Sequence, residues 1–287
     1  MSLHPAFARP RNLDQAAQVM GGLSSGAMII AGGQEMMPSV NYGALMPEVY
    51  IDIGHIKDLQ GITEADGQIH IGALTVHRDV QQSDVTQSKV PLLAYAAAQV
   101  GGGWQVHNRG TIGGNVVSMH PLYDILPSLM ALSAEVDVLK DGTEQRTALA
   151  DLLKDSSHGL GSESLLVRVV LKPMSAGAGW AYEKLKITAG GYGSANAAVI
   201  VTLDGEKITS LRVVVGAVSE LPVDVSDVLG GCRGQAWSEH LADEVEAKVA
   251  TEVKNPLSDH QGDGDWRKAM AGVMARRAIE AAIKKAQ

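Results

Sequence analysis

A glycine-rich segment in the middle of the chain has the residue types of an anion-binding turn. Gly113 and Gly114 lack a Cβ atom, so their backbone amides can approach a ligand closely. Thr111 and Asn115 flank this pair with short polar side chains, and Asp124 follows before an apolar stretch with the pattern of a helix. Phosphate is the ligand that this motif suits best. A Gly-Gly pair is equally compatible with a plain loop between packed elements.

A second Gly-Gly pair lies earlier in the chain. The apolar run over residues 27–31 is typical of a short buried strand and leads directly into Gly32 and Gly33. The Gly-x-Gly-x-x-Gly spacing of a Rossmann fold is missing here. Two phosphate-binding turns on one fold suit a ligand with two phosphates, which a dinucleotide supplies.

Strands and helices must position these turns. Apolar runs and alternation predict strands over residues 27–31, 49–53, 68–72, 135–139 and 165–171, and one-sided apolar spacing predicts helices over 13–20 and 91–100. Pro173 and the glycines that follow it mark the best candidate for a domain boundary.

The pattern changes beyond that boundary. Two apolar strands flank Asp204 and Gly205, which is a strong signal for a hairpin in an antiparallel sheet. Ser238 can cap a following helix, and apolar residues at helical spacing predict another over residues 266–286. The methionines of this last helix are expected to fill the core.

The bulk composition narrows the class of protein. With 287 residues, of which 45% are hydrophobic, the chain can bury a large core and form two or three subdomains. The net charge of -8 disfavours a nucleic-acid or anionic-membrane surface. We expect no membrane span, because the apolar runs are too short, and no signal peptide. The expected location is therefore the cytoplasm.

Metal and thiol chemistry have few candidate residues. Cys232 is the only cysteine, so this chain alone cannot hold a disulfide, an iron-sulfur cluster or a thiolate zinc site. The nine histidines show no metal-ligand spacing, and no nucleophile lies beside a base in the sequence. We therefore expect neither a metal site nor a catalytic residue in this chain, and redox chemistry would require an organic cofactor or a partner.

The two glycine segments also resemble those of a known family. Residues 31–38 and 111–115 resemble the two FAD-pyrophosphate loops of the FAD-binding medium subunit of molybdenum hydroxylases, the group that contains the flavoproteins of xanthine dehydrogenase and carbon monoxide dehydrogenase. The resemblance extends over nearly the whole chain. It includes residues 50–53, 71–75, 105–110, 183–185, 215–218, 266–268 and 276–278.

This resemblance implies an α+β fold in three parts. Residues 1–55 and 56–175 would be the two subdomains of an FAD-binding domain of the vanillyl-alcohol oxidase (PCMH) type, and residues 176–287 a smaller C-terminal α+β domain with an antiparallel sheet and helices. FAD would be bound by this chain. Electrons would arrive from two-iron, two-sulfur clusters on a small subunit, fed by molybdopterin on a large subunit, and leave to an external acceptor. A dimer of heterotrimers is the expected assembly.

The resemblance also implies the cofactor contacts. They are Ala31, Gly32, Gly33, Gln34, Glu35, Met36, Thr111, Gly113, Gly114, Asn115, Asp124 and Lys184. For Asp124 the alternative is a helix N-cap, and for Lys184 it is a solvated surface lysine. Glu35, His107 and His120 depart from the usual family residues, and Glu35 is expected to point away from the pyrophosphate toward solvent or a donor.

Two other functions fit the same features. The departures from the family pattern are compatible with a flavin-free assembly scaffold of such a complex. A stand-alone FAD reductase of the same wider fold would keep both loops and act without partners. The sequence indicates neither the substrate of the complex nor its electron acceptor.

Overall fold

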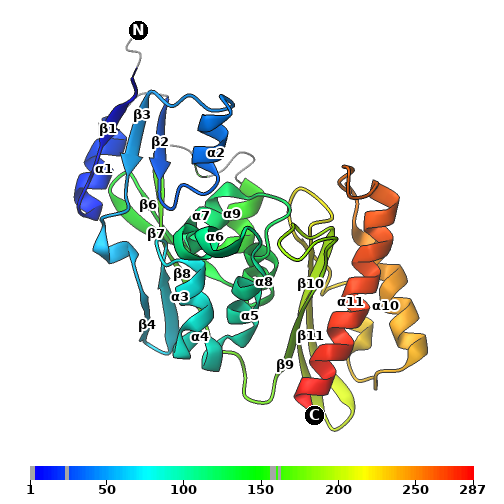
Figure 1. Ribbon diagram of the computed structural model, residues 1–287. Coiled ribbons are helices and arrows are strands. Elements are labelled where there is room, and N and C mark those ends of the chain that lie inside the picture. The colour runs from blue at the N-terminus through cyan, green and yellow to red at the C-terminus, as the bar shows by residue number, and fades with distance from the viewer. Residues whose placement is uncertain (1–3, 23–25, 156–159, 161–162) are drawn as a thin grey trace.

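The computed structural model describes residues 4–22, 26–155, 160 and 163–287, and its strands form three sheets (Figure 1). The first sheet is parallel, with the strand order β1-β3-β2. Its elements are β1 (Ala6–Ala8), α1 (Leu13–Gly21), β2 (Ala27–Ile30), α2 (Met36–Asn41) and β3 (Val49–Asp52). Asn12 caps α1 by accepting a hydrogen bond from the Gln15 amide, so this helix begins where its polar cap and apolar face predict.

The second sheet has five antiparallel strands in the order β4-β5-β8-β6-β7. Its strands are β4 (Ile62–Ala65), β5 (Gln68–Gly72), β6 (Glu135–Lys140), β7 (Thr143–Ala148) and β8 (Ser164–Leu171). The nearby helices are η1 (Lys57–Leu59), α3 (His77–Gln82), α4 (Asp84–Lys89), α5 (Pro91–Gln99), α6 (Gly103–Arg109), α7 (Ile112–Ser118), α8 (Ile125–Ala131) and α9 (Leu149–Asp155). Apolar side chains of α5, α7 and α8 pack with those of β5 and β8 in one core.

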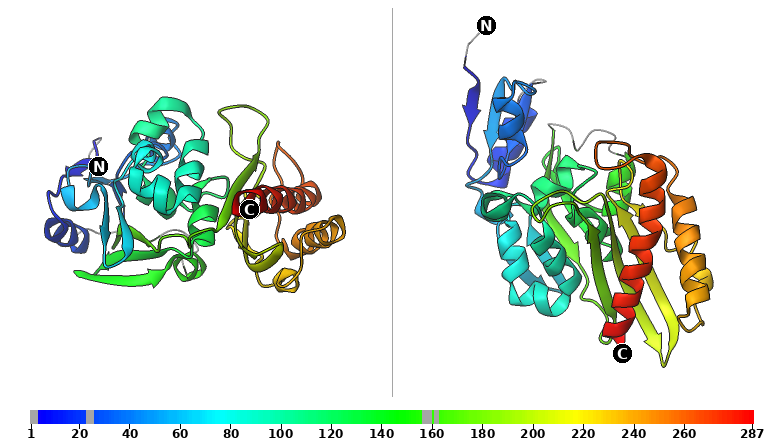
Figure 2. Two further views of the ribbon diagram at one scale, coloured as in Figure 1. Left: turned by 90° about the horizontal axis from the view of Figure 1, so that it is seen from below. Right: turned by 45° about the vertical axis from the view of Figure 1, so that its right-hand side comes forward.

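The third sheet is antiparallel, with the order β12-β11-β10-β9, and helices cover both of its faces (Figure 2). Its elements are β9 (Gly179–Leu185), β10 (Ala195–Asp204), β11 (Lys207–Gly216), β12 (Val223–Asp224), η2 (Gly230–Cys232), α10 (Glu239–Glu252) and α11 (Gly264–Ala286). Ala198 and Val214 pack with α5 and α8, whereas Ala197 and Val215 pack with α10 and α11. Because side chains alternate between the two faces along each strand, this sheet packs against both neighbouring layers.

The hairpin and the two C-terminal helices confirm the sequence prediction. β10 and β11 pair across Asp204 and Lys207, and the Ser238 hydroxyl accepts a hydrogen bond from the Leu241 amide at the start of α10. The helix predicted from residue 266 begins two residues earlier, at Gly264, because Asp263 is its cap. Met274 is buried in the core of this part, as expected.

Among the features that differ from the sequence prediction, three have a clear physical reason. Gly113 and Gly114 do not form a turn; they lie in the first turn of α7. β1 was not predicted, because it is only three residues long and has no alternation. β7 was not predicted because its residues are polar and exposed, and pairing with β6 holds it in the sheet. Arg146 supports this pairing by donating to Asp137 from Nε at 2.7 Å.

Candidate functional site

A cavity of about 740 Å³ is lined by the first sheet and the segment after β2, by α3, α6, α7 and β8, and by the loop between β9 and β10. Every cofactor contact implied by the sequence, with the exception of Lys184, lines this cavity: Ala31, Gly32, Gly33, Gln34, Glu35, Met36, Thr111, Gly113, Gly114, Asn115 and Asp124. Segments far apart in the chain therefore meet at one site. The volume falls in the range of sites that bind small molecules and cofactors.

The two glycine segments contact each other directly. A Cβ atom on Gly32 would lie 1.9 Å from the carbonyl oxygen of Arg109 and 3.2 Å from Cα of Gly110. Only glycine lets the first segment approach the second this closely. Gly33 has a φ of 71°, which also favours glycine and turns the chain toward α2. The contact between the segments places both on the same wall of the cavity.

The second segment is the start of a helix. The Thr111 hydroxyl accepts a hydrogen bond from the Gly114 amide at 3.0 Å and thereby caps α7. A Cβ atom on Gly113 would lie 2.6 Å from Cβ of Ala73, so this glycine packs against the protein. At Gly114 the added atom would meet only the Thr111 hydroxyl, at 3.0 Å. The two neighbouring glycines thus serve different purposes. Gly113 packs against the protein, whereas Gly114 leaves open space at the cavity wall.

Two buried polar atoms of the cavity lining have no hydrogen-bond partner in the protein. They are Oδ1 of Asn115 and Nδ1 of His77, whose side chains are nearly inaccessible. Burial, followed by the neighbouring His107, lowers the pKa of His77 to about 4, so its ring is neutral near pH 7. Because buried polar atoms are normally paired, this wall suits a ligand that carries polar groups. No sequence pattern singles out His77.

Asp124 and Lys184 form a buried ion pair. The Lys184 ammonium donates to Asp124 Oδ2 at 2.9 Å and to the Gln99 carbonyl at 3.1 Å, and the Tyr182 hydroxyl donates to Asp124 Oδ1 at 2.7 Å. Both charged side chains are 3% exposed. Lys184 is therefore not a solvated surface lysine, and Asp124 makes no side-chain cap to α8. Lys184 lies behind Asp124 rather than on the cavity wall.

The charges near this pair change the acidity of its members. Burial raises the pKa of Asp124, and the Lys184 ammonium and the Tyr182 hydroxyl oppose that rise. Burial and the adjacent carboxylate raise the pKa of Tyr182, which stays protonated and donates. The cavity wall therefore carries a carboxylate that is held by two fixed donors.

Aromatic residues lie beside the first glycine segment. Tyr123 donates from its hydroxyl to Glu35 Oε2 at 3.1 Å, so the exposed Glu35 has the donor it was expected to need. Burial and the nearby Glu35 carboxylate raise the pKa of Tyr123. The His120 ring stacks on those of Tyr123 and Tyr192 at centroid distances of 4.6 and 5.4 Å. Burial lowers the pKa of His120, and the negative charge of Glu35 opposes this lowering.

The sequence did not single out Tyr123 or Tyr192, although both line the cavity. The position of Tyr123 directly before Asp124 was the only sequence signal that it could lie at the cavity. Of the other departures from the family pattern, His107 forms a hydrogen bond between Nε2 and the Val100 carbonyl at 2.7 Å. That contact joins α6 to the end of α5.

The cavity lining fits FAD. Two glycine segments in contact leave room for a pyrophosphate to approach the backbone closely. Ile30, Leu74, Val106 and Leu165 supply apolar walls for ring systems. The unpaired atoms of Asn115 and His77 are available to polar groups of the cofactor.

In the described residues no three His, Cys, Asp or Glu side chains are grouped to hold a metal ion. Nor is any helix there long and apolar enough to cross a membrane.

Comparison with known proteins identifies the same two parts. Residues 3–173 match the FAD binding domain in molybdopterin dehydrogenase, and residues 180–282 match the CO dehydrogenase flavoprotein C-terminal domain. The chain is 34% identical to the carbon monoxide dehydrogenase medium chain of Hydrogenophaga pseudoflava over 96% of each chain. It is 28% identical to the glyceraldehyde dehydrogenase medium chain of Sulfolobus acidocaldarius, over 96% of this chain and 97% of the relative.

A solved structure of carbon monoxide dehydrogenase from Hydrogenophaga pseudoflava superposes with a TM-score of 0.93, at 29% identity and over 99% of both chains. The expected α+β fold, with an antiparallel sheet and helices in the C-terminal part, is confirmed. FAD is the cofactor of this chain, as the resemblance implied. The chain belongs to the family of FAD-binding medium subunits of molybdenum hydroxylases and is an oxidoreductase subunit of the carbon monoxide dehydrogenase type.

Proposed function

We propose that this chain relays electrons from iron-sulfur clusters on a partner subunit, through FAD, to an external acceptor. The observation that supports this most directly is the contact between Gly32 and the segment at Arg109 and Gly110, which brings both glycine segments to one cavity. FAD, when bound, supplies chemistry of both one-electron and two-electron transfer. The protein supplies binding, orientation and charge.

The cavity residues have separate roles in this proposal. The two glycine segments let the backbone approach the pyrophosphate closely, and Thr111 fixes the start of α7 by accepting from the Gly114 amide. Asn115 and His77 offer polar atoms that the protein leaves unpaired. Asp124 accepts from a cofactor hydroxyl while Tyr182 and Lys184 keep the carboxylate in place. Lys184 adds positive charge behind it.

We further propose the organisation given by the family. Residues 1–55 and 56–175 form the FAD-binding part and 176–287 the C-terminal domain. Molybdopterin belongs to a large subunit and the two-iron, two-sulfur clusters to a small one, because the single buried Cys232 cannot hold a cluster. A dimer of such heterotrimers in the cytoplasm is the proposed assembly.

Substrate choice lies outside this chain in our proposal. The two relatives with the names carbon monoxide dehydrogenase and glyceraldehyde dehydrogenase each match almost the whole chain, although their names state different substrates. Similar medium chains in enzymes named for different substrates are consistent with oxidation at a site on another polypeptide.

The test is to purify the complex and the isolated chain and to follow flavin absorbance on adding substrate. We expect flavin reduction in the complex and none in the isolated chain, together with release of FAD on heat denaturation. A complex without FAD would support the assembly scaffold instead. Turnover by the isolated chain would support the stand-alone reductase.

A further inference from the structure

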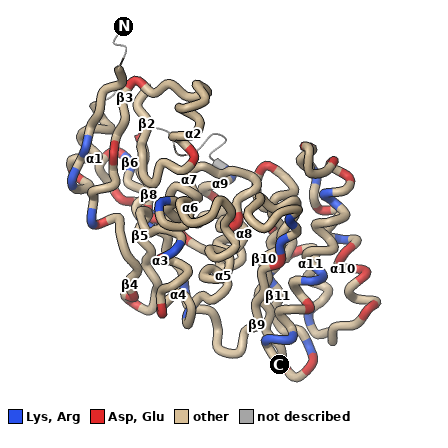
Figure 3. The backbone as a smooth tube through the Cα atoms, viewed as in Figure 1, with Lys and Arg blue, Asp and Glu red and all other residues tan. Residues whose placement is uncertain are grey.

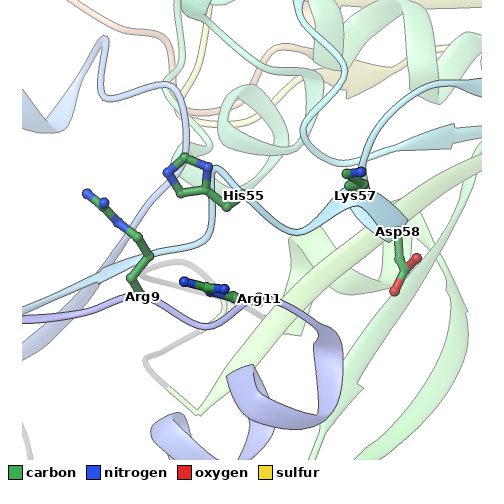
Figure 4. A pocket seen from close by; sticks show the side chains of 5 residues that line it. All are labelled: Arg9, Arg11, His55, Lys57 and Asp58. Carbon is green, nitrogen blue, oxygen red and sulfur yellow. The ribbon is translucent and has the colours of Figure 1, made fainter.

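A second concave site lies at the first sheet and is separate from the FAD cavity. Its volume is about 540 Å³, and its lining residues are Arg9, Arg11, His55, Lys57 and Asp58. No described residue lines both this site and the FAD cavity. Figure 4 shows Arg9, Arg11 and His55 gathered on one side, with Lys57 and Asp58 on the other. We call this group of five residues the cationic pocket.

The parallel pairing of β1 and β3 creates the cationic pocket. Ala8 lies opposite Ile51, so the segments that follow these two strands leave the sheet at the same edge. Arg9 and Arg11 come from the segment after β1, and His55 and Lys57 from the segment after β3. The carboxyl edge of a parallel sheet is the common place for ligands in such folds. At this same edge, β2 leads into the first glycine segment of the FAD cavity.

Arg9, whose side chain is 55% exposed, makes two contacts beside the pocket. Its Nε donates to Asp52 Oδ2 at 3.0 Å, and its guanidinium lies 5.3 Å from the centroid of the Phe7 ring. The other Asp52 oxygen accepts from the Gly54 amide at 3.0 Å, so Asp52 is itself anchored. The terminal nitrogens of Arg9 have no partner among the described residues. The two terminal nitrogens of this guanidinium are thus available to a ligand.

The remaining cations are also available. Neither the Arg11 guanidinium nor the Lys57 ammonium makes an ion pair or hydrogen bond with any residue that the structure describes. Elsewhere on this acidic chain, Lys and Arg residues are interspersed with Asp and Glu (Figure 3), and most described arginines are paired with carboxylates. The cationic pocket thus carries three cations, of which only Arg9 is paired with a carboxylate, and it favours an anion that carries more than one charge.

We propose that the cationic pocket binds a sugar-linked diphosphate of the nucleoside diphosphate class. The two guanidiniums offer bidentate donors for a diphosphate, and Lys57 adds a point charge. Asp58 accepts from a sugar hydroxyl on the far side, and the exposed His55 ring offers a face for stacking. The volume of about 540 Å³ suits a ligand of this size. An acidic segment of a partner protein is the competing occupant.

Titration calorimetry on FAD-saturated protein, with ADP as the probe, tests the proposal. We expect saturable binding of one ADP per chain, weaker at higher salt. Arg11→Ala combined with Lys57→Ala should weaken it at least about tenfold, since each removes a charged donor. FAD content should not change. The charge-matched control, Lys140→Ala with Arg233→Ala, alters exposed cations outside the pocket and should leave ADP affinity unchanged.

The alternatives give different results. Pyrophosphate, citrate and inorganic phosphate are titrated alongside ADP, and binding of all four with similar affinity would overturn the specificity for a sugar-linked diphosphate. No ADP binding, or equal weakening in the control variant, would overturn the site. If ADP fails to bind while the Arg11 and Lys57 variant loses assembly with its partner subunits, the pocket is a docking surface.

Discussion

The two glycine segments of the FAD cavity use the same dipeptide for different physical reasons. In the first segment Gly32 permits a backbone contact with Arg109 and Gly33 has a positive φ. In the second segment Gly113 packs on Ala73, while Gly114 lies at the open wall. A shared motif therefore does not imply a shared sensitivity to mutation. Substitutions in the first segment should destabilise the fold. Substitutions at Gly114 should weaken ligand binding instead.

Gly32→Ala should have the largest effect. Its Cβ atom would lie 1.9 Å from a backbone oxygen, and a backbone neighbour cannot move aside as a flexible side chain can. We expect a loss of about 3 kcal/mol in the free energy of unfolding, together with loss of FAD. Urea denaturation measures the first and flavin absorbance the second. Gly190→Ala is the matched control, because it also lines the cavity and an added Cβ there has nothing within 4 Å.

Gly114→Val should separate binding from folding. The branched side chain would project into the space where the pyrophosphate must approach, and its only close contact in the protein is the Thr111 hydroxyl. We expect FAD affinity to fall about a hundredfold, equivalent to about 2.7 kcal/mol. The thermal midpoint of FAD-free protein should change little. Normal flavin content in this variant would contradict the assignment of this segment to pyrophosphate binding.

His77 should make the second segment sensitive to acid. Its amide donates to the Gly110 carbonyl at 3.0 Å, next to the second segment. Because its pKa is about 4 in the folded protein and 6.5 in the unfolded chain, the unfolded chain binds the proton first. Stability from this residue is complete above pH 6.5 and is lost as the pH falls toward 4.

We expect His77 to account for about 2 kcal/mol of lost stability between pH 7.5 and pH 5, at 1.36 kcal/mol per pKa unit. Urea denaturation at both pH values measures it, and His77→Phe should remove this part of the pH dependence. The exposed His240 is the control position, where His240→Gln should leave the dependence intact. An unchanged pH dependence in His77→Phe would show that the buried ring does not titrate in this range.

Tyr123→Phe should have the smallest effect. It removes the hydrogen bond to Glu35 that ties the first segment to the aromatic cluster of His120, Tyr123 and Tyr192. Since Glu35 is exposed, water replaces the lost donor, and we expect a change of about 0.5 kcal/mol in stability. FAD affinity should change less than about threefold. A larger loss of FAD affinity would indicate that this hydroxyl contacts the cofactor. The variant Glu35→Gln keeps an acceptor for the Tyr123 hydroxyl and so distinguishes a contact with Glu35 from a contact with the cofactor.

Local patterns were enough to predict many elements. The caps at Asn12 and Ser238 and the hairpin at Asp204 depend on neighbours in the sequence, so they are visible without the fold. β7 was missed because its polar residues are held by pairing with β6 rather than by their own pattern. The two glycine pairs were found as motifs, and the helix at Gly113 was not, because glycine is a poor helix former and its packing on Ala73 is a tertiary contact.

The sequence by itself determined the two glycine segments, the single cysteine, the acidic balance and the family. The tertiary structure decided which groups meet. It brought Gly32 against Arg109, placed Lys184 behind Asp124, and left polar atoms of Asn115 and His77 unpaired. It also joined the segments after β1 and β3 into the cationic pocket. The reason is physical: these relations depend on distances between residues remote in the chain, which strand pairing and core packing fix and which no local pattern records.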